Sequence, residues 1–109
     1  MYWEKGGLRM NSKIKDETND KLFEAILTLE NVEECHKFFE DICTIKELQE
    51  ISQRWSVARM LDSGSNYQEV SKETGASTAT ISRVNKCLIY GSGGYKEILE
   101  KSGQGKSEK

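Results

Sequence analysis

Apolar residues recur every three or four positions through most of this chain, and polar residues fill the positions between them. This spacing is typical of amphipathic helices, because side chains three or four positions apart share one helix face. The chain also contains no proline, which favours long helices over a turn-rich fold. The pattern therefore predicts an all-α fold of six helices. The longest apolar stripes are Leu22, Ile26 and Leu29; Val32, Cys35, Phe38, Phe39 and Ile42; and Leu48, Ile51, Trp55, Ala58 and Leu61.

Capping residues indicate where the first three helices begin. Asn19 or Asp20 can cap the first and Asn31 the second, because their side chains accept hydrogen bonds from free backbone N–H groups. Thr44 is followed three residues later by Glu47, which is the pattern of a capping box. We expect this third helix to run to about Ser63.

Glycines separate the shorter helices that follow. Gly64 is expected to end the third helix, and Gly75 to end a short helix over residues 67–74. Ser77 can cap a further helix that runs to about residue 89. The run GSGG at 91–94 then interrupts the pattern before a last short helix.

These helices predict one ordered domain with two irregular ends. Residues 1–16 lack a sustained period and are expected to form a flexible arm, in which Met10 is a candidate natural start. Residues 17–101 are predicted to form the helical domain. Residues 102–109 are polar and are expected to be a disordered tail.

Composition excludes several classes of protein. No apolar run approaches the roughly 20 residues that span a bilayer, and the first twenty residues lack the apolar core of a secretory signal. We therefore expect a cytoplasmic protein with no membrane partner. The net charge is −2, but the stretch from residue 74 to residue 96 contains no acidic residue. A local cationic segment on an acidic chain is typical of a nucleic-acid-binding module with a small contact surface.

The cysteines and the single histidine do not predict a metal site. Cys35, Cys43 and Cys87 form no CxxC pair, and His36 lies beside Cys35, so the two side chains leave a helix in different directions. Enzymatic activity is not expected either. His36 has no evident catalytic partner, and the phosphate-binding pattern GxxxxGK[ST] does not occur.

Residues 67–86 read YQEVSKETGASTATISRVNK and are predicted to form a helix-turn-helix. This motif needs a buried aliphatic and a small residue in its first helix, a glycine with positive φ at the turn, and aliphatic residues on the inner face of its second helix. The residues that meet these requirements are Val70, Ser71, Gly75, Ala76, Ile81 and Val84.

The opposite face of the second helix is small, hydroxylated and cationic, and it carries no carboxylate. Small side chains allow a helix to enter the major groove of DNA, which is about 12 Å wide. Arginine can bind guanine or a phosphate, and the N–H groups near Ser77 also favour a phosphate. Lys86 adds a second cation to this face. We expect sequence specificity to come from Thr78, Ala79, Thr80, Ser82 and Arg83.

From Thr44 to about residue 99 the chain resembles the tryptophan repressor family, in particular its bacterial tryptophan-repressor-like branch. The matching residues include Glu47, the Gln53-Arg54 step and, above all, GASTATISR at 75–83. The resemblance implies an intertwined homodimer that binds palindromic operator DNA, usually as a repressor, with the helix after Ser77 in the major groove. A base-reading arginine of the family is replaced by Gln68, which can still address adenine.

The resemblance also implies an amino-acid effector such as L-tryptophan, with no other cofactor. The residues implied to bind it are Thr44, Arg54, Arg83, Val84 and Cys87. Two of these depart from the family, because Val84 replaces a glycine and Cys87 replaces a serine. The bulk of valine and the weak hydrogen bonding of a thiol make the effector part of the comparison weaker than the DNA-binding part.

Two functions remain open. The first is a dimeric transcription regulator, located in the cytoplasm and on the nucleoid. The second is an adaptor that binds other proteins and keeps the helix-turn-helix as a scaffold. The negative net charge and the presence of only two cations, Arg83 and Lys86, on the reading face favour this alternative.

Overall fold

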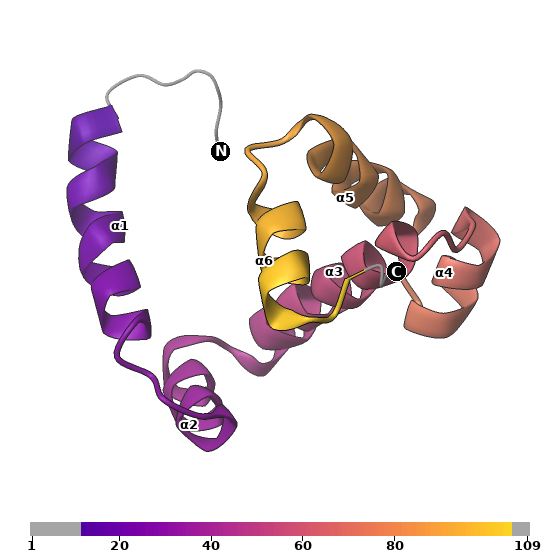
Figure 1. The fold of residues 1–109 in the computed structure, drawn as a ribbon. Coiled ribbons are helices and arrows are strands. Elements are labelled where there is room, and N and C mark those ends of the chain that lie inside the picture. The colour runs from indigo at the N-terminus through magenta and orange to yellow at the C-terminus, as the bar shows by residue number, and fades with distance from the viewer. Residues whose placement is uncertain (1–11, 106–109) are drawn as a thin grey trace. The chain divides into compact units, whose positions relative to one another are not determined.

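A computed structural model describes residues 12–105, with side chains from residue 17 onward, and contains six helices and no strand in this part of the chain (Figure 1). The predicted all-α fold of six helices is therefore confirmed. No helix in this range has both the length and the apolar character needed to cross a membrane. The helices are α1 (Ser12–Ile26), α2 (Val32–Ile42), α3 (Ile45–Asp62), α4 (Tyr67–Thr74), α5 (Thr78–Tyr90) and α6 (Gly94–Ser102).

The chain divides into two compact units, with the boundary between Ile42 and Cys43. The first unit contains α1 and α2. Helix α1 begins at Ser12, so the prediction that it begins at Asn19 or Asp20 is wrong. Residues 12–16 include lysine and aspartate and no glycine or proline, and such a segment can be helical without an apolar stripe. The predicted arm is thus helical from Ser12, while residues 1–11, including Met10, lie outside the described residues.

Helix α2 has the cap that the sequence predicts. The Asn31 Oδ1 atom accepts a hydrogen bond of 2.8 Å from the Glu34 N–H group, and Glu34 Oε1 accepts one of 2.9 Å from the Glu30 N–H group. No residue of α2 is buried. Val32 and Ile42, at its two ends, are 73% and 51% exposed.

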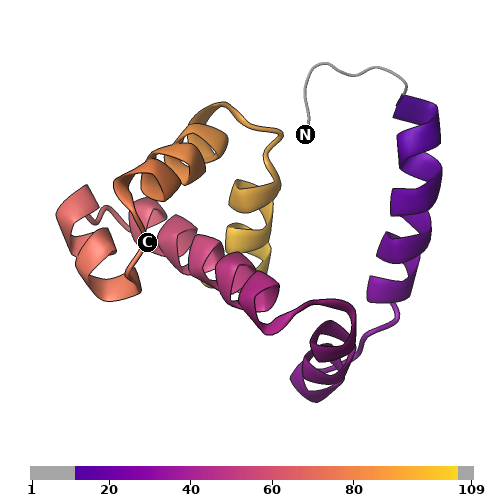
Figure 2. The ribbon, with the colours of Figure 1, turned by 180° about the vertical axis from the view of Figure 1, so that it is seen from behind.

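The second unit is built around α3, which contacts both α4 and α5 (Figure 2). Its start is fixed by the predicted capping box, in which Thr44 Oγ1 accepts from Glu47 N at 3.0 Å and Glu47 Oε1 accepts from Thr44 N at 2.9 Å. One apolar core joins α3 to the three later helices. Its buried members are Val57, Ala58, Val70, Ala76, Ile81, Val84, Leu88 and Leu99.

The chain remains ordered beyond the end of α6. The backbone N–H groups of Gln104 and Gly105 both donate to the Leu99 carbonyl, at 3.1 and 3.0 Å, and Gly103 has a φ of 73°. Within the stretch 102–109 that is expected to form a tail, Ser102 thus ends α6 and helix-capping bonds involve residues 103–105. Residues 106–109 lie outside the described residues.

Candidate nucleic-acid interface

The first helix of the motif, α4, begins and ends at residues that fix its length. Asn66 Oδ1 accepts from Glu69 N, and Glu69 Oε1 accepts from Asn66 N, each at 2.9 Å, which makes a second capping box. The helix ends at Thr74 and is capped by Gly75, whose φ of 75° lies in the left-handed region. This conformation favours glycine because a Cβ atom would strain it. The turn predicted at Gly75 is confirmed.

Side-chain hydrogen bonds then brace this turn. The Thr74 hydroxyl donates to the Val70 carbonyl at 2.7 Å and accepts from the Ala76 N–H group at 3.1 Å. Ser71 donates to the Ala76 carbonyl at 3.1 Å. The Gln53 amide of α3 donates to the Thr74 carbonyl at 3.1 Å, so α3 holds the turn from outside the motif.

The second helix, α5, has one buried side. Ile81, Val84 and Leu88 are all buried in the core, as the sequence predicts. Ser77 caps the helix, and its Oγ atom accepts from the Thr80 N–H group at 3.2 Å. The Ser77 hydroxyl also hydrogen-bonds with the Thr80 hydroxyl at 3.2 Å, and Thr80 is only half-exposed.

The opposite side of α5 is open. Within the described part of this chain, no side chain covers the residues proposed to read DNA on this helix, apart from the partial cover of Thr80. Gln68, on α4, is exposed as well. We call the exposed residues of this set the α5 outer face: Ser77, Thr78, Ala79, Ser82, Arg83 and Lys86.

The charge of the α5 outer face is entirely positive. Helix α5 contains no acidic residue, so Arg83 and Lys86 have no carboxylate on their own helix. Lys96 belongs to the same acid-free stretch of sequence but has a different role. Its Nζ atom lies 3.6 Å from Asp62 Oδ1, and the Asp62 side chain is only 9% exposed, so this cation pairs with the end of α3.

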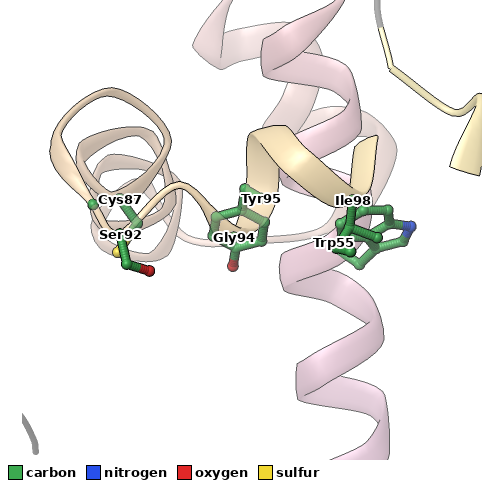
Figure 3. A pocket seen from close by; sticks show the side chains of 7 residues that line it. Trp55, Cys87, Ser92, Gly94, Tyr95 and Ile98 are labelled. Atoms are coloured by element: carbon green, nitrogen blue, oxygen red, sulfur yellow. The ribbon is translucent and has the colours of Figure 1, made fainter. Parts of the chain in front are cut away.

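A pocket of about 470 Å³ lies where α3, α5 and α6 meet (Figure 3). It is lined by Trp55, Cys87, Gly91, Ser92, Gly94, Tyr95 and Ile98. The rings of Trp55 and Tyr95 stack with centroids 6.3 Å apart and planes 22° apart. Burial raises the pKa of the Tyr95 phenol, and the charges of Arg54 and Arg83 oppose this shift, so the phenol lies within the field of both arginines.

The structure brings together only part of the residue set implied for an effector. Cys87 lines the pocket, and Arg54 and Arg83 act on the Tyr95 phenol beside it. Val84 lies in the core and is not among the residues that line the pocket. Thr44 is engaged in the cap of α3, ten residues before Arg54, which is about 15 Å along a helix axis.

The pairing of Trp55 with Tyr95 does not follow from the sequence pattern. Trp55 belongs to the apolar stripe of α3, and nothing in the local pattern near residue 95 points to a partner. The sequence feature that could have indicated this pairing is the glycine run at 91–94, which brings the start of α6 close to the end of α5. At position 91 a Cβ atom would collide with the Cys87 carbonyl, so this tight connection requires glycine.

Comparison with known proteins extends over most of the chain. Residues 17–103 match the family described as Trp repressor protein. The uncharacterized protein YerC of Bacillus subtilis is 51% identical over 89 residues, which cover 82% of this chain and 86% of YerC. A TrpR-like protein from Eubacterium eligens is 46% identical with a TM-score of 0.82, covering 89% of this chain and 100% of that one. A candidate Trp repressor from Staphylococcus aureus is also 46% identical, with a TM-score of 0.83 and coverage of 91% and 100%.

Proposed function

We propose that this chain, which belongs to the Trp repressor family, reads a specific palindromic operator as a homodimer and represses transcription. Membership of that family indicates a DNA-binding regulator. The observation that carries this proposal is the α5 outer face, which is exposed, free of carboxylates and backed by the buried core. Such a regulator would act in the cytoplasm, on the nucleoid.

The dimensions and chemistry of α5 suit the major groove. Its 13 residues make a helix about 20 Å long, and the exposed side chains of its first turn are small. Thr78 and Ala79 offer methyl groups to thymine, and Arg83 can form two hydrogen bonds with guanine. Ser77 and Lys86, both exposed, would bind phosphates, and the exposed Gln68 of α4 would add a further contact.

The exposed apolar surface of α1 and α2 supports assembly into a homodimer. These helices expose large apolar side chains, and α2 has no buried residue within its own chain. Apolar surface of this extent is typical of a face that another protein covers. A second copy of the chain also supplies the second reading helix that a palindromic operator requires. The exposed apolar residues are Leu22 and Phe23 of α1, Leu27 directly after it, and Val32 and Ile42 of α2.

We further propose that an amino acid such as L-tryptophan regulates DNA binding from the region between Arg54 and Arg83. Cys87, another residue of the implied set, lines the pocket with Tyr95, and the charges of Arg54 and Arg83 reach the Tyr95 phenol, so a carboxylate placed there would meet positive charge. Thermal-shift measurements with each amino acid test this part, since a ligand that binds only the folded state raises the melting temperature. No shift with any amino acid would rule out such an effector.

The decisive experiment for the main function is selection of duplexes from a random pool, followed by sequencing. We expect enrichment of a two-fold symmetric sequence whose half-sites are centred about 34–36 Å apart, or a multiple of that distance. Enrichment of nothing, together with recovery of a stable protein partner, would favour the adaptor instead. The net charge of −2 and the presence of only two cations on the reading face are the features that support the adaptor.

A further inference from the structure

Helix α6 is held against α3 by three contacts of different kinds. Tyr95 stacks on Trp55 at its start, Lys96 pairs with Asp62 one residue later, and the Trp55 indole N–H group donates to Gln104 Oε1 at 3.1 Å just beyond its end. These contacts lie at both ends of α6. The last helix is therefore fixed in position as well as in direction.

The same helix is coupled closely to α5. Only residues 91–93 separate the end of α5 from the start of α6. The Gly91 N–H group donates to the Cys87 carbonyl at 2.8 Å, and Gly93 has a φ of 95°. With so short and constrained a connection, Tyr95 cannot shift far without moving the carboxyl end of α5.

Tyr95 also stands at the meeting point of all three helices. It comes from α6, stacks on Trp55 of α3, and lines one pocket with Cys87 of α5 (Figure 3). The buried residues of α5 attach its inner side to the core, but they lie along a single stripe. Tyr95, joined to the carboxyl end of α5 through residues 91–93 and stacked on Trp55, adds a second attachment of that end to α3.

We propose that Tyr95 is a positioning residue for DNA recognition: by stacking on Trp55 it fixes the angle of α5 on α3, and so determines how well the α5 outer face fits the bases of its operator. This inference rests on the proposed function. Tyr95 itself touches no DNA. It acts through the orientation of Arg83 and the small residues at the start of α5.

The leverage of a helix makes this angle important. A rotation of about 10° at one end of a helix about 20 Å long moves the other end by about 3 Å. Hydrogen bonds to base edges fail over a much smaller displacement, because donor and acceptor must lie within about 3.2 Å. Contacts with phosphates tolerate the movement better, since they depend on charge at longer range. Loss of the stack should therefore reduce specific binding more than non-specific binding.

The experiment measures two dissociation constants for each variant of the full chain, one for the selected operator duplex and one for a scrambled duplex of equal length. Tyr95→Ala removes the ring, Tyr95→Phe retains it, and Tyr90→Ala removes an 81% exposed tyrosine from the end of α5 as a matched control. Circular dichroism and melting temperature establish that each variant is folded at the assay temperature. If Tyr95→Ala is unfolded, Tyr95→Leu replaces it, because leucine keeps apolar bulk without the aromatic ring.

We define the specificity ratio as the dissociation constant for the scrambled duplex divided by that for the operator. We expect this ratio to fall about tenfold in Tyr95→Ala, which corresponds to a coupling energy in the typical range. In Tyr95→Phe and Tyr90→Ala it should change less than about twofold. Binding to the scrambled duplex and its salt dependence should stay at the wild-type level in all three. A folded Tyr95→Ala protein with the wild-type ratio would overturn the proposal, and so would an equal loss on both duplexes. Failure of the wild-type protein to prefer any duplex would instead overturn the proposed function.

Discussion

The Gln53 side chain of α3 donates a hydrogen bond of 3.1 Å to the carbonyl of Thr74, which is the last residue of α4. This partly buried bond joins α3 to the turn of the helix-turn-helix. Without it, the Thr74 carbonyl loses a partner where water has limited access.

Gln53→Ala should therefore lower the free energy of unfolding by about 1 kcal/mol, the usual cost of one such bond. Gln49→Ala is the matched control, because Gln49 is an exposed glutamine on the same helix. Urea denaturation monitored by circular dichroism measures both. Equal midpoints for the two variants would show that the bond does not stabilise the turn.

Replacement of the two cations of the α5 outer face should separate base reading from phosphate binding. Arg83→Ala is expected to cost about 1–3 kcal/mol of operator binding and to relax specificity at one base pair. Lys86→Ala should weaken binding to all duplexes alike and reduce the salt slope by about one. Lys101→Ala, an exposed lysine of α6, serves as the control. Indifference of operator binding to Arg83→Ala would remove Arg83 from the reading surface.

The turn glycine offers a test of backbone conformation. Gly75 has a φ of +75°, whereas Gly94 at the start of α6 does not have positive φ, and a Cβ atom there would meet nothing closer than 4.0 Å. Gly75→Ala should thus destabilise the protein by about 1 kcal/mol or more, and Gly94→Ala should be neutral or slightly stabilising. Thermal unfolding of both variants tests this contrast. A wild-type melting temperature for Gly75→Ala would contradict the conformational requirement.

The exposed apolar residues of α2 provide a test of dimer formation. In a monomer, changes at exposed positions such as Val32 and Ile42 should alter stability by less than about 0.5 kcal/mol. In a dimer, Val32→Glu with Ile42→Glu would place two carboxylates in an apolar interface, and the chains should separate. Sedimentation velocity detects the change, with Lys37→Glu on the same helix as the control. A wild-type protein that sediments as a monomer would refute the homodimer.

Stability at high pH should depend on Tyr95. Burial raises the pKa of its phenol above the ordinary value of 10.0, so the folded state favours the neutral form. The resulting stabilisation is complete below pH 10 and is lost as the pH rises through the folded-state pKa. Wild-type protein should therefore lose more stability above pH 10 than Tyr95→Phe, in which the other tyrosines still ionise. Parallel loss in both proteins, measured by thermal unfolding across this range, would exclude the effect.

Local chemistry explains which features could be predicted from sequence. The caps at Asn31, Thr44 and Ser77 and the turn at Gly75 depend on residues within a few positions of one another, and each appears where it was expected. The buried stripe of α5 also follows directly from helical periodicity. These elements place the α5 outer face without any knowledge of tertiary contacts.

The features that sequence did not predict depend on distant contacts or on propensity without periodicity. Helix α1 extends back to Ser12 through a segment, residues 12–21, in which only Ile14 is apolar, so there is no apolar stripe to detect. The pairing of Trp55 with Tyr95 and its bond to Gln104 join segments whose proximity only the folded chain reveals. The bond to Gln104 adds to the capping bonds that hold the residues just after α6.

The bond between the Trp55 indole and the Gln104 amide has a practical consequence for how the gene can be edited. A stop codon directly after Ser102 would leave α5 untouched and yet remove the acceptor on which the indole depends. Reporter fusions and purification tags at the carboxyl end should therefore be joined after Gly105. In a protein that ends before Gly105, a loss of DNA binding could otherwise come from the missing Trp55–Gln104 bond and be mistaken for an effect on the DNA-binding residues.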